Sequence, residues 1–285
     1  MKIIISGGSG FIGSHIIKYF ESKGHEIISL NRGVFQNSAS DKLRDALCMA
    51  DIVINLAGAS INHRWSESYK RKMYESRILI TRRIVEVINS NDHKPMLFIS
   101  ASAVGFYADR GCHDEYSGEK GDGFLADLCE QWELEAQKIS PDVRLVITRF
   151  GVVLNQDGGA FIKLSLPARF KVATIVGPGN QLLPWIYLND LIKAIEHIIN
   201  QPSLKGVINF VAPGRITNRE LIEAIGWYER SFITITIPEF FFHILLGEAA
   251  DFVTKGQCVI PKKLLDSDFI FEAPTIRKFI DLLPS

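Results

Sequence analysis

The sequence is poor in cysteine and has no excess of charge of either sign. Its 285 residues include four cysteines, none of them in a CxxC pair or beside a histidine cluster. This spacing argues against a metal site and against a disulfide framework, so we expect reduced thiols. Lysine and arginine number 32, and so do aspartate and glutamate. A chain without net charge has no global field that would hold nucleic acid or an acidic membrane surface.

Long hydrophobic runs are also absent. The most apolar late stretch, residues 240–246, is far too short to cross a bilayer, which takes about 20 apolar residues. The first strand-like run starts at Lys2, so no signal peptide is expected before it. We therefore expect no membrane contact and a cytoplasmic location. The composition, 47% hydrophobic and 22% charged, suits one large globular domain or a domain with a smaller lobe.

The sequence does contain a glycine-rich turn between an apolar run and an amphipathic segment. Residues 3–5 are all isoleucine, and Gly7, Gly10 and Gly13 follow. A continuous apolar run is typical of a buried parallel strand. Glycines after such a strand let backbone N–H groups approach a pyrophosphate, and the following helix offers the anion its positive end. The spacing differs by one residue from G-x-G-x-x-G, and the alternative is a tight turn that binds nothing.

Strand-like and helical segments alternate through the first two-thirds of the chain. The predicted strands are 2–6, 26–31, 52–57, 96–101 and 144–149, and the predicted helices are 12–23, 41–48, 67–90 and 123–139. This alternation predicts an α/β fold of the Rossmann type, with a doubly wound parallel sheet and a ligand crevice at the carboxyl ends of its strands. Residues 33–51 contain no clear strand, so one strand of the fold is missing or degenerate.

After residue 150 the pattern changes to glycine turns separated by shorter elements. We predict a helix at 189–200, a strand at 206–211 and a short strand at 232–237. The last part reads as a smaller α+β lobe laid over the crevice. We therefore place a nucleotide-binding core in residues 1–155. The rest of the core, intertwined with the smaller lobe, falls in residues 156–285.

Several stretches jointly carry a family resemblance. They are residues 7–13, 55–59, 76–77, 100–107, 149–154, 185–190 and 256–265. Together they resemble the extended and atypical short-chain dehydrogenase/reductases, the NAD(P)-dependent epimerase/dehydratase superfamily. The match is to a subfamily described as nucleoside-diphosphate-sugar epimerases, with a C-terminal extension of unknown function. The resemblance covers nearly the whole chain. It implies a bound dinucleotide, and a homodimer that pairs through the helices at 67–90 and 123–139.

The end of the second predicted strand bears on which dinucleotide binds. In NAD-binding relatives a carboxylate there accepts hydrogen bonds from the adenosine ribose, but this strand ends in Asn31 and Arg32. A guanidinium suits a 2′-phosphate, so we predict NADP(H). The alternative is that Arg32 is simply solvated. The remaining cofactor contacts that we expect come from Gly7, Gly10, Phe11, Ile12, Gly13, Leu56, Ala57, Gly58, Arg77 and Ser100. For Arg77 an ion pair on the helix surface is an equal alternative.

The residues for proton transfer depart from the superfamily pattern, which is a Ser or Thr together with Tyr-x-x-x-Lys on one helix. The matching helix has Phe124 and Leu128 at the Tyr and Lys positions, and neither side chain can transfer a proton. Two other matches to the spacing lie elsewhere. One is Tyr19 with Lys23 on the first helix, away from the nicotinamide end. The other, Tyr116 with Lys120, lies in a glycine-containing turn that does not guarantee a shared face.

Two hydroxyl groups remain as catalytic candidates. Ser102 follows the strand at 96–101, where the family has its catalytic Ser or Thr, and Tyr107 lies five residues further on. Such a pair could orient a carbonyl or hydroxyl group and donate one proton. The alternative is that Ser102 caps a turn and that Tyr107 packs beneath the lobe.

Three functions are consistent with these motifs. The first is an NADP(H)-dependent oxidoreductase or epimerase acting on a small carbonyl, hydroxyl or nucleotide-sugar substrate. The second is an NADP(H)-binding sensor or scaffold that has lost turnover, as Phe124 and Leu128 suggest. The third is a lyase or isomerase that uses the dinucleotide structurally. In each case the expected partner is a small molecule, without a metal, nucleic acid or membrane.

Overall fold

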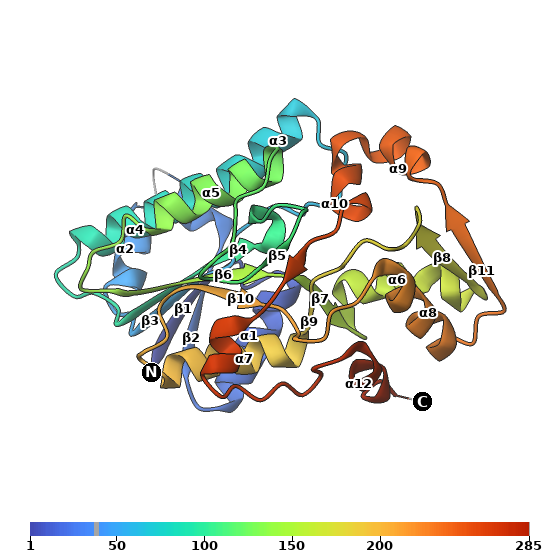
Figure 1. Cartoon of the computed structure of the whole chain (residues 1–285). Helices are drawn as coiled ribbons and strands as arrows, with labels where there is room; N and C mark the ends of the chain where they lie inside the picture. Colours follow the sequence, from blue (N-terminus) through green and yellow to red (C-terminus); the bar gives the residue numbers. More distant parts are fainter. Residues whose placement is uncertain (37–39, 285) are drawn as a thin grey trace.

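A six-stranded parallel sheet organises the molecule (Figure 1). The computed structural model describes residues 1–36 and 40–284. From one edge to the other the strands are β10 (Gly206–Phe210), β6 (Arg144–Phe150), β4 (Leu97–Ala103), β3 (Ile52–Asn55), β1 (Lys2–Ser6) and β2 (Glu26–Leu30). The isoleucine run of β1, which lies beside the edge strand β2, is fully buried, because helices cover both faces. This is the predicted Rossmann-type fold.

The two helix layers form two separate cores. On one face α1 (Phe11–Ser22) and α7 (Leu188–Asn200) pack against β1 and β3. On the other face lie α2 (Ser40–Leu47), α4 (Ile80–Ser90) and α5 (Phe124–Ala136). The predicted helix at 67–90 is continuous, and it consists of α3 (Glu67–Tyr74), a π-helical turn over Glu75–Leu79, and α4. The apolar face of each helix therefore packs against the sheet and belongs to one of the two cores.

The stretch after β2 contains no strand in its described part. Residues Arg32–Phe35 form a 3-10 turn, and α2 follows, while residues 37–39 lie outside the described part of the chain. The strand β2 is thus the edge of the sheet. The prediction that one strand of the fold is missing here is confirmed for the residues that the structure describes.

A second group of elements packs beside the carboxyl ends of the strands (Figure 1). It contains three two-stranded parallel sheets, β7 (Val152–Asn155) with β9 (Trp185–Tyr187), β8 (Val172–Val176) with β11 (Ile233–Ile237), and β5 (Cys112–His113) with β12 (Cys258–Val259). Its helices are α6 (Gly159–Arg169), α8 (Asn218–Tyr228), α9 (Glu239–Leu246), α10 (Asp251–Thr254) and α12 (Ile276–Asp281), whereas α11 (Lys262–Asp266) packs beside β10 on the main sheet. The chain returns to the main sheet with α7 and β10, so the two groups are interleaved. The boundary near residue 155 stays a prediction.

A disulfide joins two of these short strands, contrary to the expectation of reduced thiols. Cys112 and Cys258 are direct partners in the β5–β12 ladder, with their Cα atoms 4.5 Å apart, and their sulfur atoms are bonded. Cys48 and Cys129 are free. The sequence could not indicate this pair, because the two cysteines are 146 residues apart and only the fold brings them together.

The described residues contain neither a metal-binding group nor a membrane-spanning helix. No three His, Cys, Asp or Glu side chains are grouped so that they could hold an ion. None of the helices in this part of the chain is long and apolar enough to cross a bilayer.

Candidate functional site

The glycine-rich turn forms a tight cradle between β1 and α1. Gly7 has a φ of 76°, and a side chain there would come within 2.6 Å of the Leu56 carbonyl oxygen. The N–H of Gly10 donates to the Gly7 carbonyl at 3.0 Å and closes the turn. A side chain at Gly13 would collide with the same carbonyl, so the helix lies directly on the turn. Gly7 and Gly13 therefore require glycine, whereas a side chain at Gly10 would lie 3.2 Å from the Gly7 carbonyl oxygen.

The amino end of α1 is open to an anion. Its N-cap is Gly10, which makes no side-chain cap, and the first turn carries no acidic residue. The side chains of Phe11 and Ile12 point into the core, where the Phe11 ring packs against Gly158 and Gly159. Their backbone N–H groups belong to the first turn of the helix, which has no intrahelical acceptors for its donors. The positive end of the helix dipole is therefore available to a phosphate.

Arg32 lies beside this cradle. The β1–β2 register pairs Ser6 with Leu30, so the residues that follow both strands are neighbours. Asn31 precedes the 3-10 turn, and Arg32 is exposed at its start. Within the described part of the chain the guanidinium forms neither an ion pair nor a hydrogen bond. No carboxylate follows β2, because its last residues before the turn are Leu30 and Asn31.

A buried hydrogen-bond network supports the next strand end. The amide of Asn55 accepts from the Ser6 hydroxyl at 2.5 Å and donates to the Thr81 hydroxyl at 2.7 Å. The Trp132 indole donates to the same Thr81 oxygen at 2.8 Å. The network ties β1 and β3 to α4 and α5, and it fixes the backbone that continues through Leu56, Ala57 and Gly58. None of these contacts could be read from the sequence, since the partners are up to 51 residues apart.

Arg77 extends a largely buried positive charge toward the same backbone. It lies in the π-helical turn, and its guanidinium donates to the Ala59 carbonyl at 2.9 Å and lies 5.3 Å from the centre of the Trp132 ring. A side chain at Gly58 would come within 3.0 Å of the guanidinium carbon. Burial lowers the pKa of Arg77. The ion-pair alternative is wrong for the described residues, which provide no carboxylate to this side chain.

The β4 strand end carries two buried serines. Ser100 is 1% exposed, and its hydroxyl has no hydrogen-bond partner in the described structure. Ser102 donates to a Glu133 carboxylate oxygen at 2.6 Å. The same carboxylate receives two hydrogen bonds from Arg149, at 2.8 and 2.7 Å. Burial alone would lower the pKa of Arg149, but the bonded carboxylate raises it above its usual value.

Tyr107 is also buried, and its ring stacks on His113. Its hydroxyl donates to the Asn209 side-chain oxygen at 2.8 Å, and burial raises the pKa of this hydroxyl. The Arg149 guanidinium lies 4.6 Å from the ring centre. The structure therefore gives both predicted hydroxyls, Ser102 and Tyr107, internal hydrogen-bond partners. Their catalytic role stays a prediction that requires these bonds to rearrange.

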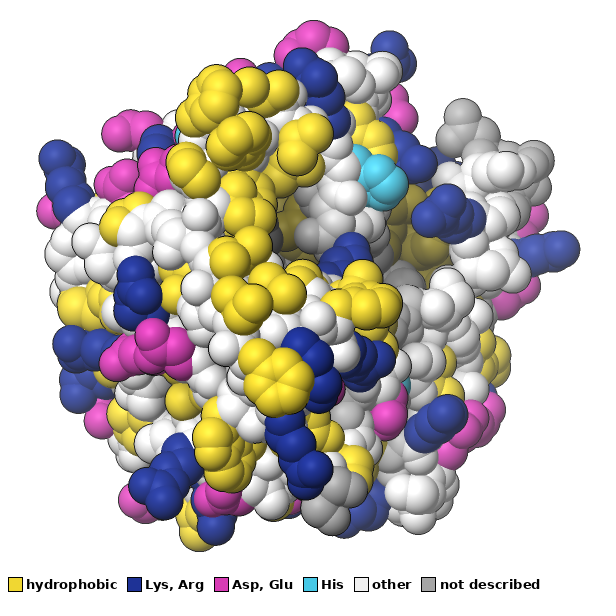
Figure 2. Space-filling model, turned by 90° about the vertical axis from the view of Figure 1, so that its right-hand side faces the viewer, with side chains coloured by type: hydrophobic (Ala, Val, Ile, Leu, Met, Phe, Trp, Pro, Cys, Tyr) yellow, Lys and Arg dark blue, Asp and Glu magenta, His cyan; other side chains and the backbone are white. Residues whose placement is uncertain are grey.

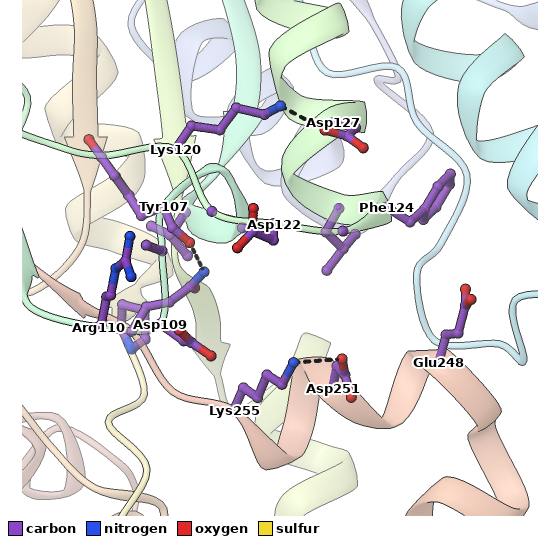
Figure 3. A pocket seen from close by; sticks show the side chains of 18 of the residues that line it. Tyr107, Asp109, Arg110, Lys120, Asp122, Phe124, Asp127, Glu248, Asp251 and Lys255 are labelled. Atoms are coloured by element: carbon purple, nitrogen blue, oxygen red, sulfur yellow. Dashed lines mark hydrogen bonds and ion pairs between the residues drawn. The ribbon is translucent and has the colours of Figure 1, made fainter.

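A cleft of about 680 Å³ is lined by Tyr107, whereas Ser102 is not among its lining residues (Figure 3). One wall is the start of α5 with Phe124, and the opposite wall is the segment from Glu248 to Gln257. Trp65 and Leu183 contribute apolar surface. The charged side chains around it are Lys70, Asp109, Arg110, Lys120, Asp122, Asp127, Glu248, Asp251 and Lys255. The cleft is thus open to polar ligands of modest size.

Ion pairs join several of the charged side chains that surround the cleft. Lys70 of α3 reaches across to Glu248 at 2.5 Å, and its Nζ lies 5.4 Å from the centre of the Phe124 ring. Lys255 pairs with Asp251 at 3.0 Å. Sequence reasoning missed the Lys70 contact, since the two residues belong to distant parts of the chain.

Neither alternative Tyr-x-x-x-Lys match forms a catalytic pair at the cleft. Lys120 binds Asp127 at 2.7 Å and Glu130 at 3.0 Å, whereas Tyr116 is 65% exposed and lies beside Lys263. Tyr19 lies on α1 and Lys23 directly follows this helix, and both contact Glu196 of α7. Phe124 lines the cleft, and Leu128 is buried behind it. The positions of the family's Tyr and Lys are therefore apolar in the folded protein too.

Comparisons with known proteins agree with this arrangement. Residues 3–120 match the model of the NAD dependent epimerase/dehydratase family, and residues 237–281 match a domain of unknown function, DUF1731. The chain is 32% identical to the epimerase family protein SDR39U1 homolog, chloroplastic, of Arabidopsis thaliana, over 95% of this chain and 83% of that protein. It is also 32% identical to epimerase family protein YfhF of Bacillus subtilis, over 95% of this chain and 94% of that one.

A solved structure supports the same relationship. The crystal structure of human epimerase family protein SDR39U1 with NADPH superposes with a TM-score of 0.91. The two chains are 28% identical, and the match covers 98% of each.

Proposed function

Because this chain belongs to the NAD-dependent epimerase/dehydratase family, we propose that it binds NADP(H) at the carboxyl ends of its sheet. The glycine cradle and the open end of α1 would hold the pyrophosphate. Arg32 would bind the 2′-phosphate. The observation that carries the choice of NADP(H) is that Arg32 lies beside the cradle with no carboxylate at the end of β2. The NADPH in the human relative supports it.

Arg77 adds a second argument for an anionic ligand. A mostly buried cation without a carboxylate partner is costly in a folded protein, and an anion that binds beside it removes part of this cost. The guanidinium lies against Gly58 at the end of β3, where the family fold has its cofactor crevice. We assign Arg77 to a phosphate or ribose hydroxyl of the dinucleotide. The orphan hydroxyl of Ser100 is the third group in this assignment.

For the reaction we propose hydride transfer to a small carbonyl compound, or from a small hydroxyl or nucleotide-sugar compound, in the 680 Å³ cleft. Bound NADPH would supply the hydride in the first case, and bound NADP⁺ would accept it in the second. The residues of the cleft must then exclude water, orient the substrate and provide a proton. Ser102 and Tyr107 stay the proposed hydroxyl pair, and their use requires release from Glu133 and Asn209.

A sensor that binds NADP(H) without consuming it is the second candidate. Phe124 and Leu128 favour it, because they remove both members of the usual proton-transfer pair. The internal hydrogen bonds of Ser102 and Tyr107 favour it as well.

The binding proposal is tested by titrating the protein with NADPH and NADH and following intrinsic fluorescence. We expect tighter binding of NADPH. Arg32→Ala should weaken NADPH by about 10- to 100-fold, the usual worth of a charged hydrogen bond, and leave NADH unchanged. Arg277→Ala is the matched control, since it removes an exposed arginine on α12. Equal affinities for the two dinucleotides that Arg32→Ala leaves unaltered would contradict the proposal.

A second experiment separates enzyme from sensor. NADPH absorbance is followed while a panel of small aldehydes, ketones and keto-sugars is offered. Consumption that Ser102→Ala or Tyr107→Phe abolishes, with NADPH binding retained, would identify the hydroxyl pair as catalytic. Tight binding without consumption of NADPH would favour the sensor.

A further inference from the structure

A band of exposed apolar side chains covers the outer face of the smaller lobe. Phe232 before β11 is 84% exposed, and Leu245 on α9 is 69% exposed. Others on these elements are Ile233, Ile235, Phe240, Phe241 and Ile244. Figure 2 shows hydrophobic side chains gathered in a band down this face of the molecule. A continuous apolar patch of this kind is uncommon on a monomeric protein and marks an interaction surface.

The strand β11 presents a free edge within this band. It pairs in parallel with β8 and ends the two-stranded sheet. The Ile233 N–H donates to Lys171, and the Ile237 carbonyl accepts from Gly177, so the odd-numbered residues bond toward β8. Thr234 and Thr236 therefore direct their backbone N–H and C=O groups to the outer edge. The strand contains none of the charged residues or prolines that usually protect an edge.

The sequence of β11 is the same in both directions, Ile-Thr-Ile-Thr-Ile. In an antiparallel pairing centred on Ile235, each threonine faces a threonine and each isoleucine faces an isoleucine. Thr234 would then exchange two hydrogen bonds with the partner subunit's Thr236, which uses the groups that β8 leaves free. Matched threonine and β-branched pairs are favourable across strands. This symmetry is what a two-fold axis requires of a strand that pairs with itself.

We propose that a second copy of this chain binds here, with the two β11 strands antiparallel about a two-fold axis at Ile235. A stable interface needs roughly 800 Å² per partner. Aromatic side chains of about 150–250 Å² each, together with the exposed isoleucines and Leu245, provide an area of this order. The absence of net charge leaves no long-range repulsion between copies. This dimer differs from one formed through the predicted helices 67–90 and 123–139.

The outer surface of those helices is less suited to pairing. On these helices Arg82 pairs with Glu135 at 2.7 Å, and Lys138, just after α5, pairs with the same carboxylate at 2.8 Å. The larger exposed apolar side chains among the described residues 67–90 and 123–139 are Tyr74, Leu79 and Leu134, each less than half exposed.

Self-crosslinking tests the proposed register. Residue 235 would face its own copy in a pair without hydrogen bonds, with Cα atoms about 4.5 Å apart, a spacing that a disulfide can bridge. On mild oxidation Ile235→Cys should form a covalent dimer faster than Thr234→Cys, whose opposite residue is 236. Ile270→Cys is the control, since that side chain is 85% exposed elsewhere on the molecule. Wild-type protein measures the background from Cys48.

The mass in solution provides the second readout. Light scattering should give twice 32.0 kDa for the wild type and half that value for Ile235→Lys, while Ile270→Lys stays dimeric. A monomeric wild type at tens of micromolar would overturn the proposal. So would crosslinking of Ile235→Cys no faster than Ile270→Cys, or a dimer that Leu134→Cys traps instead. If Ile235→Lys fails to fold, the cysteine variants decide.

Discussion

At the scale of single residues, the Glu133–Arg149 pair is the most deeply buried ion pair in the described part of the chain. Both side chains are almost completely buried, and they share two hydrogen bonds while Ser102 adds a third to the same carboxylate. The guanidinium also lies 3.5 Å from the centre of the Phe106 ring. A charge held in this way cannot lose its partner without a large cost. The pair therefore holds the loop that carries Tyr107 against β6.

Arg149→Met should lower the free energy of unfolding by about 3–5 kcal/mol, because it leaves the Glu133 charge buried and unpaired. The measurement is urea denaturation followed by circular dichroism. Arg71→Met is the control, since Arg71 pairs with Glu75 on an exposed helix face, and its loss should cost less than about 0.5 kcal/mol. The double variant Glu133→Leu with Arg149→Met should recover part of the loss. Equal effects of Arg149→Met and Arg71→Met would show that the buried pair is not structural.

Cys129, which lies near Glu133, allows a test of burial in this region. Burial, followed by the nearby Glu133 charge, raises the pKa of its thiol to about 11. At pH 8 the thiol is therefore protonated and shielded, so iodoacetamide should modify half-buried Cys48 and leave Cys129 intact. Both should react in 8 M urea, as read by peptide mass spectrometry. Modification of Cys129 at the rate of Cys48 in the native protein would refute the buried environment.

The sequence predicts the structural role of a residue only where the local backbone conformation determines that role. The glycine turn with Gly7 and Gly13 is predicted from its place between an apolar run and an amphipathic segment, and the geometry that requires these two glycines is local. The partners of Ser102 and Tyr107 are Glu133 and Asn209, which lie 31 and 102 residues away. Whether a hydroxyl faces a cleft or a buried carboxylate depends on strand register and helix rotation. One sequence without a structure does not determine either of these.

At the scale of elements, the main sheet could be predicted because its strands are buried on both faces. Continuous apolar runs mark such strands, and the five strands predicted in the first 150 residues are all present in the sheet. The sequence did not predict β5, β7, β8, β9 and β12, of which all but the five-residue β8 have only two to four residues. Short strands have weak local signals, and their pairing depends on distant partners.

The Lys70–Glu248 contact links α3 to the C-terminal segment across the cleft. Lys70→Met should speed backbone hydrogen exchange in residues 239–257, because that segment loses a contact with the core. Overall stability should change little, since Glu248 is largely exposed. Lys262→Met is the control, as it breaks only an exposed pair with Asp266 inside α11. Unchanged exchange in residues 239–257 would show that the contact does not hold the segment.

At the scale of the whole molecule, the disulfide connects the end of the chain to the cleft. Cys258 follows Gln257, whose amide donates to the Tyr107 carbonyl at 2.6 Å. The bond thus secures the segment that forms one wall of the cleft. The disulfide also argues against the cytoplasmic location expected from the sequence, because a reducing compartment would keep Cys112 and Cys258 as free thiols. The location stays a prediction.

Reduction should measure how much this link contributes. For a loop of this length, chain entropy predicts a loss of about 4–5 kcal/mol in the free energy of unfolding. Urea denaturation with and without a reductant is the measurement. The double variant Cys112→Ser with Cys258→Ser should match the reduced protein and be insensitive to the reductant. An unfolding midpoint of the wild type that reductant does not move would contradict a structural role for the bond.

The same bond divides the chain into a closed ring and two open arms. Residues 1–111 carry the glycine cradle, Arg32 and Arg77, and they lie outside the ring together with residues 259–285. If the two ends of the protein are pulled, only the arms can lengthen, by about 3.3–3.6 Å for each residue released. Strands β6 and β10 lie within the ring. A tensile force would therefore dismantle the glycine cradle while the ring that carries these strands stays covalently closed.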